Sequence, residues 1–133
     1  VSLMTSGNGR ILNMSSILGR IGVPGYAAYC TSKHGILGLT RALAHELAPR
    51  SITVNAICPG WVDTEMARLG VRETAEALGT TEEAFREQAI EEVPQRRFLE
   101  PEEVARLAVF LASDDASGIT GQAYNVSGGQ VMS

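Results

Sequence analysis

The chain has few of the features that mark nucleic-acid-binding, membrane-spanning or secreted proteins. Its 133 residues include 11 Lys and Arg against 15 Asp and Glu, for a formal net charge of -4. Surfaces that bind nucleic acid or anionic membranes are normally basic, so neither partner is expected. No apolar run approaches the roughly 18 residues that a membrane-spanning helix needs. The N-terminus also lacks the basic and apolar segments of a signal peptide, which favours a cytoplasmic protein.

Cysteine and aromatic residues are scarce too. Cys30 and Cys58 both lie within apolar patterns, and no Cys/His cluster with ligand spacing accompanies them. We therefore expect buried reduced thiols, with neither a disulfide nor a metal site. Aromatic residues make up 5%, whereas hydrophobic residues make up 44% and charged residues 20%. This is an ordinary globular composition, and the length suits one domain.

Apolar runs alternate with helical patterns along the chain. The run at residues 10–15 does not alternate between polar and apolar, which is typical of a strand buried on both faces of a parallel sheet. The expected elements are strands at 10–15, 52–58 and 123–127, and helices at about 27–47, 80–92 and 100–111. Strands and helices in this order predict an α/β fold with parallel crossovers.

The first of these helices has an unusual number of small residues. Gly35 and Gly38 lower helix propensity, so we expect another backbone to approach them closely, either the sheet or a second subunit. The apolar face is predicted to consist of Ile36, Leu37, Leu39, Leu43 and Leu47.

Residues 67–98 form a charged segment of helical character between the second and third strands. Thr80 and Glu83 have capping-box spacing, which predicts a helix start at this point. The segment is too long for a plain loop, so a lid or substrate-binding wall is expected, with a solvated surface insertion as the alternative. Trp61 is expected either to cover a substrate pocket or to pack structurally.

Ser16, Tyr29 and Lys33 are the residues best placed to carry chemistry together. Tyr29 and Lys33 are four apart in the predicted helix, so their side chains share one face. A phenol has an unperturbed pKa of about 10, and a neighbouring ammonium favours the phenolate. Ser16 follows the first strand and could hold a carbonyl or alcohol oxygen beside the phenol. The three residues predict a proton-transfer site for carbonyl/alcohol chemistry.

Four ordered signals run through the chain: Ser16, Tyr29-x-x-x-Lys33, Asn55-Ala-Ile-Cys-Pro-Gly60 followed by Val62 and Thr64, and Ile119-Thr-Gly-Gln with Gly128-Gly129. In this order and spacing they resemble the short-chain dehydrogenase/reductase family, and the resemblance covers nearly the whole chain. Within the family, it is most similar to polyketide ketoreductases and 3-oxoacyl-carrier-protein reductases. 3-Hydroxybutyrate dehydrogenases are also similar. The resemblance implies the C-terminal part of a doubly wound, parallel-sheet, Rossmann-like fold with a helical lid.

The resemblance also implies a role for each residue. Tyr29 would be the acid/base, Lys33 would lower its pKa and hydrogen-bond the nicotinamide ribose, and Ser16 would orient the substrate oxygen. The nicotinamide site would be shaped by Pro59, Gly60, Val62 and Thr64 as well. The implied cofactor is NADP(H) or NAD(H), with NADP(H) slightly favoured. The implied substrate is a small carbonyl or alcohol compound, such as a carrier-bound acyl chain or a 3-hydroxybutyrate-like hydroxy acid.

The family's glycine-rich phosphate loop and ribose-selecting residue are absent from these 133 residues and are expected upstream. Residues 1–133 are therefore interpreted as the catalytic part of one Rossmann-like domain. The alternative is a catalytically incompetent fragment or assembly module. The family's catalytic asparagine also belongs upstream, so Asn13 and Asn55 are not assigned that role. The resemblance further implies a homo-oligomer, a tetramer or a dimer, and the isolated chain is expected to be unstable or to associate.

Overall fold

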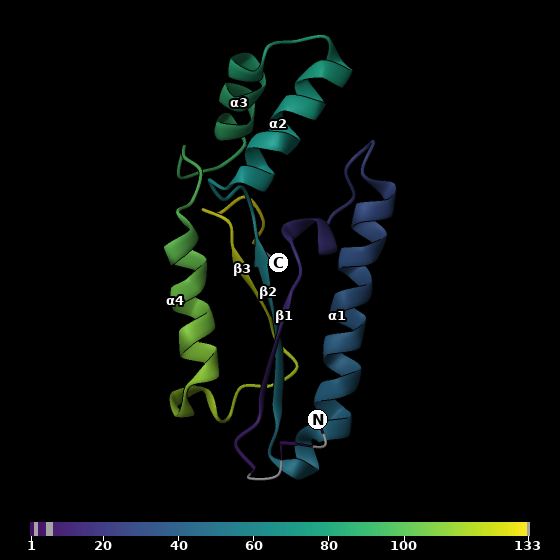
Figure 1. Cartoon of the computed structure of the whole chain (residues 1–133), viewed down its shortest axis with the longest axis vertical. Coiled ribbons are helices and arrows are strands. Elements are labelled where there is room, and N and C mark those ends of the chain that lie inside the picture. Colours follow the sequence, from purple (N-terminus) through teal and green to yellow (C-terminus); the bar gives the residue numbers. More distant parts are fainter. Residues whose placement is uncertain (2, 5–6, 133) are drawn as a thin grey trace.

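The computed structural model describes residues 1, 3–4 and 7–132, which form a three-layer α/β arrangement. Strands β1 (Arg10–Met14), β2 (Thr53–Pro59) and β3 (Ala123–Val126) form a parallel sheet in the order β1-β2-β3. Helix α1 (Ala27–Leu47) and helix α4 (Pro101–Ala112) lie on opposite sides of the sheet (Figure 1). The predicted α/β class and parallel crossovers are confirmed.

The central strand β2 is covered on both faces, whereas β1, for which burial on both faces was predicted, is only partly buried because it lies at the edge of the described sheet. Residues 53–58 are all buried. The polar Asn55 is accommodated because its side chain donates to the carbonyl of Ile119 at 2.7 Å and accepts from the backbone N–H of Gln122 at 3.1 Å. A buried amide with both ends paired avoids the penalty of an unsatisfied polar group. Asn55 therefore holds the segment that leads into β3 against strand β2.

Helix α1 has the predicted bounds, but its expected contacts need two corrections. Leu37 and Leu47 are buried as expected, whereas Leu39 is 52% exposed and points away from the core. The sheet does not approach Gly35 or Gly38, because a Cβ at either position would meet no described atom within 4 Å outside the helix itself. Packing against the sheet therefore does not explain these glycines, and the second-subunit alternative stays a prediction.

The segment between β2 and α4 folds into a helical hairpin whose two ends are joined by backbone hydrogen bonds. It contains α2 (Glu65–Leu78) and α3 (Glu82–Glu91), drawn at the top of Figure 1. At the base, the backbone N–H of Asp63 donates to the carbonyl of Leu99 at 2.8 Å, and the N–H of Leu99 donates to the carbonyl of Trp61 at 2.9 Å. The hairpin therefore leaves the sheet and returns to it at neighbouring points.

Aromatic residues form the core of this hairpin base. The Trp61 ring stacks on Phe98 at a centroid distance of 5.2 Å and meets Phe85 edge-on at 6.3 Å. Of the two expected roles for Trp61, the structure shows packing. The predicted cap was wrong by one residue: Thr81, not Thr80, accepts from the backbone N–H of Ala84 and begins α3.

Helix α4 begins at Pro101 with a charged cluster. The Glu103 carboxylate accepts from the backbone N–H of Glu100 at 2.8 Å and from Arg97 at 2.6 and 2.7 Å. The Arg97 hydrogen bonds, helped by that N–H, lower the pKa of Glu103 to about 2. The apolar side of the helix packs against the sheet and is formed by Val104, Leu107, Ala108 and Leu111.

Two expectations from composition can be checked directly. Cys30 and Cys58 are both buried free thiols, as predicted. Within the described part of the chain, none of the helices combines the length and the apolar character needed to cross a membrane.

Candidate active site

Ser16 lies just beyond the carboxyl end of β1, where the chain turns toward α1. Its side chain is nearly buried and caps a short 3₁₀ helix at Ile17–Gly19 by accepting from the backbone N–H of Leu18 at 3.1 Å. A hydroxyl group carries one donor proton besides its acceptor lone pairs. Because the cap uses only acceptor capacity, the Ser16 proton stays available for a carbonyl oxygen.

The loop that carries Ser16 is held tightly against α1. The neighbouring Ser15 hydroxyl donates to the backbone carbonyl of Lys33 at 2.9 Å, and the Ser15 N–H donates to the carbonyl of Ile57 on β2. Gly19 is required here by a close approach: a Cβ on it would lie 2.5 Å from the Ser15 hydroxyl and 2.8 Å from the Lys33 carbonyl. The register between the Ser16 loop and α1 is therefore fixed by packing.

Tyr29 and Lys33 lie on the first two turns of α1, at the same end of the sheet as Ser16. The Tyr29 side chain is 40% exposed, so its phenol is accessible to a ligand. The Lys33 ammonium donates to the carbonyl of Met14 at 3.1 Å and lies 5.4 Å from the centroid of the Tyr29 ring. An ammonium has three donors, so this contact leaves two for a further partner. The predicted pairing of Tyr29 with Lys33 is present.

Tyr26 connects this group to the hairpin, which the sequence pattern did not reveal. Its hydroxyl forms a 2.6 Å hydrogen bond with the hydroxyl of Thr74 on α2. Its ring meets the Tyr29 ring edge-on at a centroid distance of 6.5 Å. Tyr26 therefore joins α2 to the first turn of α1. The two partners are 48 residues apart, so no local pattern indicates the pair.

The four residues expected at the nicotinamide site follow one another at the carboxyl end of β2. Gly60 packs closely on the turn after β3, since a Cβ on it would lie 3.0 Å from the Ser127 Cβ. Val62 pairs with Leu99 in an isolated bridge, and Pro59 ends β2. The Thr64 hydroxyl caps α2 by accepting from the backbone N–H of Ala67 at 3.2 Å, which leaves it a second lone pair.

Further residues of β1, α1 and α2 have structural partners or are exposed. The Asn13 amide donates to the Thr40 hydroxyl at 2.9 Å and thereby ties β1 to α1. His34 and His45 are both exposed residues of α1, and His34 also borders a cavity between this helix and the sheet. Of the apolar residues of α2, Val71 is buried in the hairpin, whereas Met66 is 77% exposed and Leu69 is 50% exposed.

Comparison with known proteins identifies the family. A family model described as enoyl-(acyl carrier protein) reductase matches residues 1–130. The chain belongs to the short-chain dehydrogenase/reductase family. It is 50% identical over 127 residues to a protein of Streptomyces virginiae named monensin polyketide synthase putative ketoacyl reductase, covering 96% of this chain and 49% of that protein.

Two further members of the short-chain dehydrogenase/reductase family agree with the predicted subfamily. A 3-oxoacyl-[acyl-carrier-protein] reductase of Rickettsia felis is 42% identical over 130 residues, with 98% of this chain and 49% of that protein covered. A crystal structure of an actinorhodin polyketide ketoreductase variant with NADPH superposes with a TM-score of 0.90 at 42% identity, over 97% of this chain and 49% of that one. The chain thus spans about half the length of these relatives.

Proposed function

We propose that this chain is the catalytic part of a nicotinamide-dependent ketoreductase that interconverts a ketone and a secondary alcohol. The observation that carries the proposal is the arrangement of Ser16, Tyr29 and Lys33 at the carboxyl end of the sheet, with the Lys33 ammonium 5.4 Å from the Tyr29 ring. In open parallel sheets, ligands bind at this end of the strands. Ketoreductase names among the relatives support the same reaction class.

Proton transfer is assigned to Tyr29. In reduction, its hydroxyl donates a proton to the carbonyl oxygen of the substrate, and in oxidation the phenolate takes the alcohol proton. The Ser16 hydroxyl donates a second hydrogen bond to the same oxygen and thereby orients the substrate. The Lys33 ammonium stabilises the negative charge that develops on the Tyr29 oxygen. Lys33 is itself fixed by the Met14 carbonyl at the end of β1.

The residues present fit a nicotinamide nucleoside beside Tyr29. The two unused Lys33 donors suit ribose hydroxyls, and the second lone pair of Thr64 suits a carboxamide N–H. Pro59, Gly60 and Val62 form the wall after β2. When bound, the nicotinamide supplies or accepts the hydride, whereas this chain supplies position and the proton. NADP(H) is favoured over NAD(H) because the related actinorhodin enzyme was solved with NADPH.

The substrate is proposed to be a 3-oxoacyl compound, free or carrier-bound, as the names of the relatives suggest. The exposed apolar side chains of Met66 and Leu69 on α2 suit contact with an acyl chain. The helical hairpin would then act as the lid. A 3-hydroxybutyrate-like hydroxy acid is the alternative substrate.

Residues 1–133 are proposed to form the catalytic part of a single Rossmann-like domain in a cytoplasmic homo-oligomer, either a tetramer or a dimer. The chain spans about half of its relatives, which supports this assignment. The uncovered Gly35 and Gly38 on α1 suit close approach of a second copy. The competing proposal is that the chain serves as an inactive assembly module.

Replacing Tyr29 with phenylalanine in the full-length protein tests the assignment. Loss of the only proposed proton donor is expected to lower kcat by about 10²- to 10⁴-fold. Binding of NADPH, followed by its fluorescence, is expected to change little because the ring remains. Tyr124→Phe on β3 is the matched control and should retain activity. Near-normal turnover of Tyr29→Phe would overturn the assigned role, whereas an inactive wild-type protein would favour the assembly module.

A further inference from the structure

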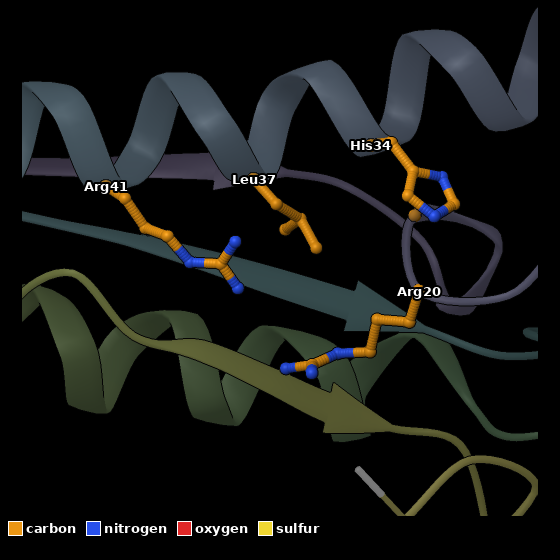
Figure 2. A pocket seen from close by; sticks show the side chains of 5 residues that line it. Arg20, His34, Leu37 and Arg41 are labelled. Carbon is orange, nitrogen blue, oxygen red and sulfur yellow. The ribbon is translucent and has the colours of Figure 1, made fainter.

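A cavity of about 250 Å³ lies between α1 and the sheet, away from the phenol of Tyr29. Its lining consists of Gly19, Arg20, His34, Leu37 and Arg41. In Figure 2, His34 and Arg41 reach from α1 toward the sheet, while Arg20 reaches across from the loop after β1. Two arginines and a histidine thus meet in one small space. No carboxylate among the described residues lines it.

Arg20 is anchored with most of its donors unused. One terminal nitrogen donates to the carbonyl of Ala123 at the start of β3. The Arg20 Nε is buried and has no partner among the described residues. A guanidinium carries five N–H donors in a fixed fork, so one anchored nitrogen leaves donors directed at the cavity. Because the Nε itself is covered, the donors that an anion in the cavity can reach are those of the terminal nitrogens.

Arg41 and His34 complete the cationic lining. Within the described part of the chain, Arg41 takes part in no ion pair, although other arginines do pair, such as Arg10 with Asp114. The Nδ1 atom of His34 lies 2.9 Å from the carbonyl of Cys30 one turn earlier. Its Nε2 therefore stays available on the other side of the ring. Uncompensated cations are notable because the chain is acidic overall, with a net charge of -4.

We propose that this cavity is a binding site for a small anion, a carboxylate or phosphate group held by Arg20 and Arg41. Arginine forks match the oxygens of both groups in bidentate geometry, and Leu37 supplies the apolar wall. The lining includes neither Lys33 nor the segment after β2, which are proposed to hold the nicotinamide. An anion bound here would link the loop that carries Ser16 to the helix that carries Tyr29 and Lys33.

Nuclear magnetic resonance of the full-length ¹⁵N-labelled protein tests the site directly. Sodium phosphate is titrated at constant ionic strength against sodium chloride, and the arginine Nε–Hε signals are followed. The signals of Arg20 and Arg41 are expected to shift saturably with phosphate. Arg41→Gln, which removes no hydrogen bond or ion pair among the described residues, should weaken apparent affinity at least tenfold. Arg106→Gln on α4 is the matched control and should leave affinity unchanged.

The test uses Arg41→Gln because Arg20 also bonds to the Ala123 carbonyl, so Arg20→Gln could disturb the fold. A linear response that sodium chloride reproduces would overturn the proposal, as would equal weakening in Arg106→Gln. Sedimentation velocity then distinguishes two sources of the anion. If a carboxylate of a second copy occupies the site, the Arg41 signal shifts with protein concentration and phosphate lowers the oligomer fraction. If a free anion is the ligand, the oligomer fraction stays constant while phosphate binds.

Discussion

Substitution of Gly19 by alanine should test whether close packing of the loop after β1 positions Ser16 for catalysis. We expect it to lower both the stability of the fold and kcat. Gly19 is buried where the loop after β1 crosses α1. The new Cβ would lie 2.5 Å from the Ser15 hydroxyl and 2.8 Å from the Lys33 carbonyl. The carbonyl belongs to a helix backbone that cannot move freely. The loop must therefore shift, and Ser16 shifts with it.

The size of the effect follows from two contributions. Overpacking a buried position by one methyl group costs about 1–3 kcal/mol, and losing the hydrogen bond from Ser15 to the Lys33 carbonyl costs about 1 kcal/mol more. The free energy of unfolding is therefore expected to fall by about 2–4 kcal/mol. A displacement of Ser16 by about 1 Å is expected to lower kcat by about 100-fold.

Urea unfolding and steady-state kinetics of the full-length enzyme measure the two effects. Gly22→Ala on the same loop is the control, because a Cβ there meets no described atom within 4 Å. It should change the free energy of unfolding by no more than about 0.5 kcal/mol and leave kcat intact. Equal stability of the Gly19→Ala and Gly22→Ala proteins would refute the close packing of this loop. Full kcat in a destabilised Gly19→Ala protein would refute the positioning of Ser16.

Two more expectations follow from contacts outside the catalytic group. Tyr26→Phe removes the hydrogen bond between Tyr26 and Thr74. This bond contributes about 1 kcal/mol, so its loss should raise the KM for the substrate about fivefold. Thr74→Val should have the same effect, and additive effects in the double variant would exclude a shared bond. Because the pKa of Glu103 is lowered to about 2, its bridge to Arg97 should stabilise the fold fully above pH 4.5 and be lost as pH falls toward 2. Unfolding midpoints of wild type and Glu103→Gln should therefore converge over that range, and a constant difference would contradict the bridge.

Sequence predicted best where local chemistry decides the structure. Helix α1 begins at Ala27 and ends at Leu47 as predicted, because a Pro-Gly turn precedes it and Pro49 follows it. The spacing of Tyr29 and Lys33 fixes their common face once the helix is given. Ser16 lies at the same end of the sheet because it follows β1, whose last residue, Met14, accepts from the Lys33 ammonium.

The sequence predicted least well those features that depend on contacts between distant segments or on which side chains face solvent. The contact between Tyr26 and Thr74 joins residues 48 apart, and no periodicity encodes it. Leu39 has the apolar character of a core residue, yet its direction depends on how α1 rotates over the sheet. The cap of α3 fell on Thr81 because Gly79 ends α2 in a left-handed conformation and Thr80 still bonds back to Ala75. The arginine-lined cavity likewise depends on how the loop after β1 and helix α1 are placed relative to each other.

The position of β1 at the side of the sheet has a practical consequence. β1 pairs with β2 on one side, and its other side offers backbone donors and acceptors to an incoming strand. A separately expressed polypeptide that supplies such a strand could dock there and rebuild the sheet from two chains. Under the proposed function of Ser16, Tyr29 and Lys33, turnover would then report on the docking, since it would depend on both polypeptides. An edge strand of this kind makes the chain suitable for testing as one component of a two-chain reporter.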